Sequence, residues 1–319
     1  MRVRQPTIEG ILSAITNLIP PILYPSLRTI LIKTLQLGPL PNHVGFIMDG
    51  NRRFSRQAGL PLEDGHRAGF EALKRILELL LRLEVPNVTV YAFAIGNFKR
   101  PPEEVSKLMD LARTKLVQIC EKGQLLDRYG IRVVVIGRKD LLPPDIKESV
   151  MKVEEMTANN KKGCLNVAFP YSSQEEIATA ICRTAMDTIS HQKPTSTIEV
   201  DTIDQNLYTS HSPPLDILIR TSGVTRLSDF LLWQTTFLNG GKQGNTAEGG
   251  AYNRVEECNN SMPKSLDNKT NPAATIPSSS SSVHFVSTFW PHFGLLDVLP
   301  ILLGWQAEQI LSSLFSFCQ

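Results

Sequence analysis

Apolar and polar positions alternate along this chain in a way that predicts strands separated by helices. Short apolar runs of the kind found in buried strands lie at residues 43–48, 88–94, 131–136, 165–169, 215–219 and 283–287. Residues 64–84 and 102–116 instead repeat their apolar side chains with the period of a helix. This alternation favours an α/β fold with a parallel, helix-covered sheet, in which ligands bind at the carboxyl ends of the strands.

Two stretches depart from this pattern, and the first is N-terminal. Residues 1–40 contain an uncharged run, residues 10–27, that approaches the length of a membrane-spanning helix but is interrupted by three prolines. We expect residues 1–40 to form an apolar or amphipathic segment that associates with a membrane surface. The alternative is a helix packed on the domain.

The second stretch, at about residues 237–282, is polar and rich in Gly, Ser and Asn, so we expect it to be disordered. It is either a surface insertion or an artefact of the gene model. The expected organisation is therefore an N-terminal segment at residues 1–40 and one domain at residues 41–319, interrupted by this insertion.

Composition adds limits to this picture. The chain has 319 residues, of which 42% are hydrophobic and 20% charged, enough to bury a full core. Its net charge is +2, so no overall field indicates a nucleic-acid partner, and any anion site must come from a local cluster of arginines. The five cysteines lack the spacing of metal ligands, which favours reduced thiols.

The first candidate site lies where the apolar run at residues 43–48 ends in Asp49, Gly50 and Asn51, followed by Arg52 and Arg53. Gly50 permits a tight turn, and the start of a following helix offers N–H groups to an anion. A carboxylate at Asp49 could hold a divalent cation that bridges to phosphate oxygens. The alternative is an ordinary Asp-Gly turn before a basic helix.

A second candidate site follows residues 215–219, where Arg220, Arg226 and Ser228 belong to a Gly-containing loop. Two arginines with hydroxyl and backbone donors suit a diphosphate, although either arginine alone would more often form a surface ion pair. We expect Ser228 or a neighbour to cap a helix that starts here. Two neighbouring anion sites, one of which has a metal-binding carboxylate, suggest transfer of a prenyl group between diphosphates.

Four segments resemble the signature blocks of cis-prenyltransferases: residues 43–53, 65–69, 91–100 and 219–234. A fifth, residues 289–293, resembles the Trp-Pro block that closes the family's pattern. The likeness covers residues 41–234 and 283–306 and is greatest to the eukaryotic dehydrodolichyl diphosphate synthases. The resemblance implies a six-stranded parallel sheet flanked by helices, with a hydrophobic tunnel.

The resemblance also implies a reaction, in which isopentenyl diphosphate units are added to an allylic diphosphate such as farnesyl diphosphate to make a polycis product for dolichol synthesis. Asp49 would bind Mg²⁺, and the catalytic residues would be Asp49, Asn51 and Asn97. The substrate-binding residues would be Gly50, Arg52, Arg53, Phe54, His66, Phe93, Phe98, Arg100, Arg220, Arg226 and Ser228. The proton acceptor stays open, because an amide is a poor base and a diphosphate oxygen or Asp49 is as plausible.

Several positions depart from the family pattern. Ala94 and Gly96 replace residues that usually support Asn97, and Leu62 replaces an arginine of bacterial members. The sequence also ends without the family's Arg-x-Gly tail, which implies a heteromer with a Nogo-B-receptor-like subunit at the cytosolic face of the endoplasmic reticulum membrane. The alternative is a non-catalytic scaffold subunit, but the retained arginines and Asp49 favour the enzyme.

Overall fold

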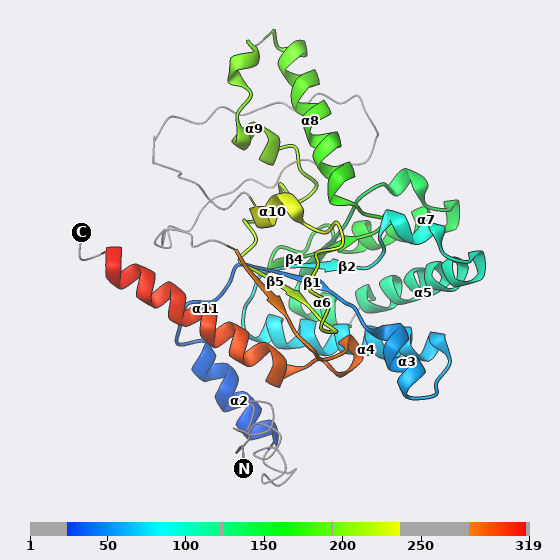
Figure 1. The fold of residues 1–319 in the computed structure, drawn as a ribbon, viewed down its shortest axis with the longest axis vertical. Coiled ribbons are helices and arrows are strands. Elements are labelled where there is room, and N and C mark those ends of the chain that lie inside the picture. The colour runs from blue at the N-terminus through cyan, green and yellow to red at the C-terminus, as the bar shows by residue number, and fades with distance from the viewer. Residues whose placement is uncertain (1–23, 122–123, 193, 237–280, 317–319) are drawn as a thin grey trace, which may run out of the picture.

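The structure, a computed structural model, describes residues 24–121, 124–192, 194–236 and 281–316. Its centre is a six-stranded sheet in the order β3-β4-β2-β1-β5-β6, with every neighbouring pair parallel (Figure 1). The strands are β1 (His43–Ile47), β2 (Asn87–Tyr91), β3 (Ile131–Ile136), β4 (Gly163–Ala168), β5 (Ile217–Arg220) and β6 (Ser282–Phe285). The predicted parallel sheet is therefore confirmed. Residues 1–23 and most of the expected insertion lie outside the described residues.

Helices lie on both faces of the sheet. The larger apolar core takes side chains from α2 (Tyr24–Leu35), α4 (Leu62–Arg82), α5 (Pro102–Cys120), α6 (Leu125–Tyr129), α7 (Pro144–Met156) and α11 (Leu295–Ser316). A smaller core on the other face takes its side chains from the strands and from loop residues such as Tyr171, Leu215 and Phe230. Three further α-helices after β4 are α8 (Ser173–Ser190), α9 (Val200–Asp204) and α10 (Leu232–Thr236). In Figure 1, α8 and α9 project away from the sheet, whereas α2 and α11 lie together at the opposite end.

The alternation of residues along each strand explains how one sheet supplies both cores. Ile217 and Ile219 of β5 belong to the larger core, while Leu218 between them belongs to the smaller one. In α4, the buried side chains Ala72 and Ile76 follow one another at helical spacing. The apolar period seen in residues 64–84 therefore marks the face of α4 that packs on the sheet.

Trp290 links the last part of the chain to the first strand. It is fully buried in the 3₁₀ helix η5 (Trp290–His292), where its ring stacks on Phe293 at 5.6 Å and lies 5.8 Å from Phe46 of β1. Its indole N–H donates to the Gly69 carbonyl at 2.7 Å, and its backbone N–H donates to the Asp49 carbonyl at 3.0 Å. The segment after β6 therefore fixes the turn at the end of β1.

The chain joins the sheet for the last time at β6. Ser282, the final residue of the expected insertion, is already the first residue of this strand and pairs with Ile217. The hydroxyl of Ser281 lies 3.5 Å from the carbonyl of Gln234 in α10. The described residues on either side of residues 237–280 are therefore close together.

One predicted helix start is wrong. Ser228, Asp229 and Leu231 have φ values of 52°, 62° and 48°, in the left-handed region, so the chain is not a right-handed helix here. The next helix, α10, begins only at Leu232, whose N–H donates to the Ser173 hydroxyl at 2.9 Å. Ser228 is therefore part of a loop and not an N-cap.

We expect Trp290→Ala to lower the free energy of unfolding by about 3–5 kcal/mol, because it leaves a cavity beside Phe46 and removes the indole hydrogen bond to the Gly69 carbonyl. Urea denaturation followed by circular dichroism measures the change. The matched control is Phe315→Ala in α11, since this aromatic side chain is 72% exposed and its loss should change stability by less than about 0.5 kcal/mol. A loss below about 1 kcal/mol for Trp290→Ala would contradict the anchoring role.

Candidate functional site

The turn after β1 places Asp49 and Gly50 at the carboxyl end of the sheet, as predicted. Gly50 has a φ of +104°, and a Cβ there would come within 2.9 Å of the Phe289 ring, so glycine is required in this turn. Helix α3 (Asn51–Gln57) begins directly afterwards. The Asp49 carboxylate accepts a hydrogen bond from the Gly50 N–H at 2.6 Å, which fixes the carboxylate over the turn.

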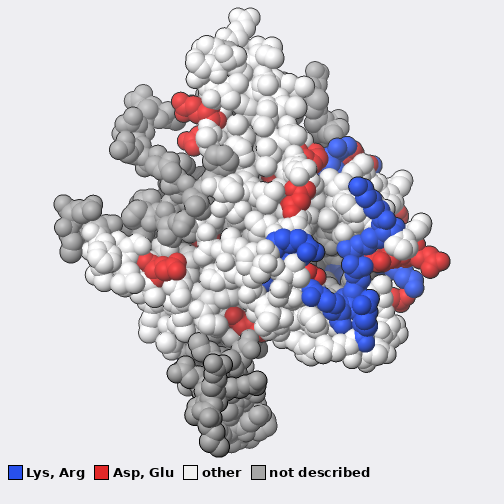
Figure 2. All heavy atoms as spheres, in the orientation of Figure 1, with Lys and Arg blue, Asp and Glu red and all other residues white. Residues whose placement is uncertain are grey.

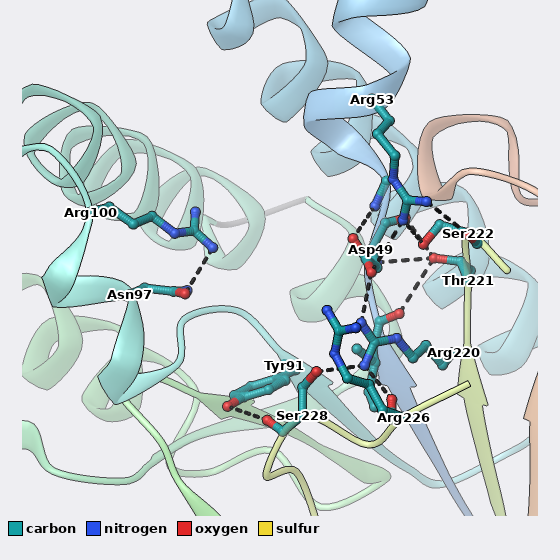
Figure 3. Close-up of polar contacts among 12 residues, drawn as sticks. Asp49, Arg53, Tyr91, Asn97, Arg100, Arg220, Thr221, Ser222, Arg226 and Ser228 are labelled. Carbon is teal, nitrogen blue, oxygen red and sulfur yellow. Dashed lines mark hydrogen bonds and ion pairs between the residues drawn. The ribbon is translucent and has the colours of Figure 1, made fainter. Parts of the chain in front are cut away.

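An ion pair between Asp49 and Arg220 joins the two candidate anion sites (Figure 3). Arg220 Nη2 lies 2.8 Å from Asp49 Oδ2, and Arg53 Nη2 lies 3.4 Å from the same oxygen. The Arg220 side chain is 3% exposed, whereas that of Asp49 is 32% exposed. Burial alone would raise the pKa of Asp49, but the hydrogen bond and charge of Arg220 outweigh it. The pKa is therefore lowered, and the carboxylate is ionised at neutral pH.

Arg220 also orders the loop that follows β5. Its Nη1 donates to the Ser228 hydroxyl at 2.6 Å and to the backbone carbonyl of Arg226. Its Nε is buried and has no hydrogen-bond partner among the described residues. The side chain of Arg226 is exposed, and Figure 3 shows it close to Arg220. The structure thus brings together the three residues predicted for the second anion site.

Arg53 connects the first site to this loop and to the last part of the chain. It donates to the Ser222 carbonyl at 3.1 Å and to the Ser222 hydroxyl, while its guanidinium carbon lies 5.3 Å from the centre of the Phe289 ring. Sequence reasoning missed the role of Phe289, because the two residues are far apart in the chain and no local pattern links them. The cation–π contact limits the positions that the Arg53 guanidinium can adopt.

A second polar cluster lies apart from Asp49 in Figure 3 and contains Asn97 and Arg100. Arg100 donates to Asn97 Oδ1 at 2.8 Å and to Glu104 Oε1 at 2.9 Å, and Arg52 Nη1 lies 3.7 Å from the same Glu104 oxygen. Arg100 therefore supports Asn97 despite the departures from the family pattern just before it. The sequence analysis missed Glu104, although its spacing of four residues from Arg100 is the signal of such a pair.

His66 in α4 lies within the electrostatic reach of this cluster. Burial lowers the pKa of His66, and the charge of Arg100 lowers it further, so the imidazole is neutral at pH 7. The Nε2 atom of His66 and the Oδ1 atom of Asn51 are buried and lack hydrogen-bond partners among the described residues. Since buried polar atoms are nearly always paired, the His66 atom, which borders a cavity between α4 and α5, is suited to contact a bound ligand, whereas the Asn51 oxygen lies against Gly69 of α4.

A cavity of about 540 Å³ opens beside His66, between α4 and α5. Its apolar wall includes Leu62, Leu108 and Leu111, and charged side chains such as Lys107 also line it. This volume is typical of a small-molecule site. The cavity extends from the polar cluster along two helices that carry the larger core.

The three aromatic residues predicted to line the substrate lie in two places. Phe54 in α3 packs edge-on against His292, with ring centroids 5.0 Å apart. Phe93 is 2% exposed and packs against Phe98 at 4.9 Å and Phe169 at 5.5 Å, in the larger core. Within the described part of the chain, no ring contact joins Phe54 to the other two.

Basic side chains gather locally on the surface. Figure 2 shows Lys and Arg concentrated on the side of the molecule that carries α3 and α5, whereas most of the remaining visible face is uncharged. Because the net charge of the chain is only +2, this concentration is a local feature of the kind expected at an anion site.

The chemistry of Asp49 limits how a metal ion can bind. The described residues contain no group of three or more His, Cys, Asp or Glu side chains able to hold a metal ion by themselves. Mg²⁺ is commonly bound by one or two carboxylates together with phosphate oxygens. The single, partly exposed carboxylate of Asp49 therefore fits a metal ion that a diphosphate ligand also holds.

Comparison with known proteins agrees with this geometry. Residues 47–239, more than half of the chain, match the family model described as "Putative undecaprenyl diphosphate synthase". The chain belongs to this family of prenyltransferases. The matched range of the prenyltransferase contains every predicted site residue, from Asp49 to Ser228, and ends before the Trp290 anchor.

Relatives of this prenyltransferase include subunits of enzyme complexes. It is 37% identical over 286 residues to a dehydrodolichyl diphosphate synthase complex subunit of Schizosaccharomyces pombe, covering 88% of this chain and 91% of that one. It is 44% identical over 202 residues to a human dehydrodolichyl diphosphate synthase complex subunit, covering 63% of this chain and 61% of the human one. An isoprenyl transferase of Thermus thermophilus is 36% identical over 283 residues, and the alignment covers 88% of this chain and 91% of that protein.

Solved structures confirm the predicted fold of the prenyltransferase. Lavandulyl diphosphate synthase from Lavandula x intermedia, in complex with dimethylallyl diphosphate, aligns with a TM-score of 0.64 at 24% identity. A probable undecaprenyl diphosphate synthase from Campylobacter jejuni aligns with a TM-score of 0.56 at 21% identity. Each alignment covers 84% of this chain and 95% of the other.

The charges around His66 predict how its pKa responds to substitution. Glu104→Gln removes a carboxylate that raises the pKa of His66, so we expect a lower pKa, whereas Arg100→Gln removes a cation that lowers it, so we expect a higher one. NMR titration of the imidazole measures both shifts. Because the folded state disfavours the protonated imidazole, wild-type stability should also fall as the pH drops below about 6.5.

The matched control is Glu63→Gln, which removes a carboxylate from the wall of the same cavity and should leave the pKa of His66 nearly unchanged. Shifts in the same direction for the Glu104 and Arg100 variants would show that the cluster does not surround His66 as described.

Proposed function

We propose that this prenyltransferase adds isopentenyl diphosphate to an allylic diphosphate such as farnesyl diphosphate, making a polycis-polyprenyl diphosphate for dolichol synthesis and protein glycosylation. The observation that carries the proposal is the Asp49–Arg220 ion pair, because it sets two arginine-containing sites side by side at one end of the sheet. This transfer needs two diphosphates close together, one as the leaving group and one on the acceptor. Relatives named as dehydrodolichyl diphosphate synthase subunits support the product class.

The turn after β1 suits the allylic diphosphate. Arg52 and Arg53 are exposed beside it, so their guanidinium N–H groups can donate to diphosphate oxygens. These arginines stabilise the negative charge that develops on the departing diphosphate. Mg²⁺, held in part by Asp49, would add Lewis-acid stabilisation of the same leaving group.

The loop after β5 suits the acceptor, isopentenyl diphosphate. Arg220 is buried and held by Asp49 and Ser228, so its guanidinium is fixed before a ligand arrives. Arg226 is exposed and offers a second fork of N–H donors to the diphosphate oxygens. Fixed donors lose little conformational freedom on binding, which favours a defined position for the acceptor double bond.

Asn97 is suited to orienting a substrate, and it is not suited to accepting a proton from one. Because a guanidinium can only donate hydrogen bonds, the Asn97 atom facing Arg100 is the amide oxygen, and the amide N–H groups remain as donors. Asp49 is a weak base here, since the Arg220 hydrogen bond lowers its pKa. We therefore favour a diphosphate oxygen as the proton acceptor.

The cavity between α4 and α5 suits the growing isoprenoid chain. Three leucines, Leu62, Leu108 and Leu111, line it among charged side chains such as Lys107 and Asp110, and it begins beside His66 and Glu104. An apolar chain that enters it is removed from water, which favours binding in proportion to the buried area. This cavity supports the hydrophobic tunnel expected from the family resemblance.

We place the enzyme in a heteromeric complex with a Nogo-B-receptor-like subunit. Relatives from fission yeast and human are named as complex subunits, which supports a partner. The projecting end of α8 exposes Met186 and Ile189 at 65% and 77%, an apolar surface that a partner would cover. A non-catalytic scaffold is less well supported, because it needs neither Asp49 nor the paired arginine sites.

We also place the enzyme at the cytosolic face of the endoplasmic reticulum membrane. Within the described residues, α11 is the one helix long and apolar enough to cross a membrane, and about a third of that stretch is buried. Its outward residues Leu303, Ile310 and Leu314 are 48%, 48% and 59% exposed. In the sequence, the uncharged residues 10–23 precede α2, which itself packs on the larger core through Ile32 and Leu35. Together with residues 10–23, the exposed face of α11 supports contact with a lipid surface.

Incorporation of labelled isopentenyl diphosphate, with farnesyl diphosphate and Mg²⁺, tests the function with the chain alone and with its partner. We expect Asp49→Asn to lower turnover by about 10²- to 10³-fold while circular dichroism shows an unchanged fold. The matched control is Asp64→Asn, which removes a more exposed carboxylate paired with Arg67 and should retain activity. Turnover of Asp49→Asn within twofold of wild type would refute its role, and inactive wild-type complex would favour the scaffold.

Flotation with neutral phosphatidylcholine vesicles tests the membrane face. We expect the double variant Leu303→Glu and Ile310→Glu to lose vesicle binding, because two charges would enter the apolar layer. Binding by the wild type should change little with salt, since α11 carries no Lys or Arg. Ile189→Glu on α8 is the matched control and should bind vesicles as the wild type does. If the double variant also binds vesicles as well as the wild type, α11 does not contact the membrane.

A further inference from the structure

The loop that carries the acceptor-site residues, residues 226–231, has an unfavourable backbone conformation. Three non-glycine residues in it, Ser228, Asp229 and Leu231, have positive φ values. Such residues persist only where surrounding contacts determine their conformation. The acceptor loop (residues 226–231) therefore depends on contacts with the rest of the domain.

Asp229 makes the polar contacts that tie the acceptor loop to the start of α8. Its Oδ2 accepts a hydrogen bond from the Ser172 hydroxyl at 2.5 Å, and its Oδ1 accepts one from the Gln174 N–H at 3.0 Å. Its backbone carbonyl accepts a third bond from the Ser173 N–H at 2.9 Å. Ser172 is the N-cap of this 18-residue helix, so the loop is joined to a rigid element.

The residues on either side of Asp229 both contact Tyr91, but only Ser228 also faces the acceptor site. On one side, Ser228 accepts a hydrogen bond through its carbonyl from the Tyr91 hydroxyl at 3.3 Å, and its own hydroxyl faces Arg220. On the other side, Phe230 is fully buried and stacks on the Tyr91 ring at 4.4 Å. Asp229 thus lies between the substrate-facing part of the loop and its buried anchor.

We propose that Asp229 is a positioning residue for the isopentenyl diphosphate site. By fixing the loop to α8, its carboxylate keeps the Ser228 hydroxyl and the Arg226 carbonyl on the guanidinium of Arg220. The inference rests on the proposed function of this loop as the acceptor site. Asp229 itself faces α8 and not Arg220, so it acts on the substrate only through its neighbours.

Steady-state kinetics of the full complex test the proposal. We expect Asp229→Ala to raise KM for isopentenyl diphosphate by about 10-fold, with kcat and the KM for farnesyl diphosphate within about twofold of wild type. Asp229→Asn keeps one oxygen that can accept from Gln174 or Ser172, so it should recover most of the affinity. A purely structural role predicts a lower melting temperature with both KM values unchanged.

Asp204→Ala is the matched control, because this carboxylate accepts a hydrogen bond from the Trp233 indole in the same region but does not touch the acceptor loop. If Asp229→Ala does not fold, Ser172→Ala removes one of the two side-chain bonds and should raise the same KM by a smaller factor. Unchanged KM in the folded variants, or equal increases for both substrates, would overturn the proposal.

Calorimetric binding of isopentenyl diphosphate separates failure of this inference from failure of the proposed function. An affinity of Asp229→Ala for isopentenyl diphosphate about 10-fold below that of the wild type supports the positioning role, even if the wild type shows no turnover. Absence of turnover in the wild type would refute only the proposed reaction. Equal affinity of wild type and Asp229→Ala in an active enzyme would refute the positioning role alone.

Discussion

A buried positive charge determines the arrangement of this site. The Arg220 side chain is 3% exposed, and leaving such a guanidinium without an anion would cost about 3–5 kcal/mol. Asp49 is that anion, and it is in reach because Ile47 of β1 pairs in register with Arg220 of β5. The Thr221 hydroxyl lies 3.0 Å from the Asp49 nitrogen and 2.8 Å from its carbonyl oxygen, so the two strand ends are joined independently of the charges.

The same arrangement occurs twice around the site. One carboxylate, Asp49, lies between Arg220 and Arg53, and another, Glu104, lies between Arg100 and Arg52. Each carboxylate limits the repulsion between arginines that a diphosphate would otherwise have to neutralise. Because carboxylates and phosphates present similar oxygen pairs, Arg53 and Arg52, whose side chains are 43% and 57% exposed, can contact a diphosphate while Arg220 stays on Asp49.

The sequence identified the strands and the polar residues at their carboxyl ends, because apolar runs that stop at charged residues leave a local pattern. It also predicted that the two anion sites are neighbours, but it did not give the order of the strands, since the order of β2, β1 and β5 depends on packing between distant segments. The contact of Phe289 with Arg53 was missed for the same reason. The cap predicted at Ser228 was wrong because tertiary contacts, above all those of Asp229, impose a left-handed conformation that local propensity does not encode.

The close approach of Ser281 to Gln234 has a consequence for how the protein can vary. The chain leaves α10 and returns to β6 at neighbouring points, and β6 begins at the amino end of β5, whereas Asp49 lies beyond the carboxyl end of β1. Each doubling of the length of a flexible connection between such points lowers the free energy of unfolding by only about 0.6 kcal/mol. The connection between α10 and β6 is therefore an insertion site, where evolution or protein engineering can add a domain or a label without altering the residues around Asp49.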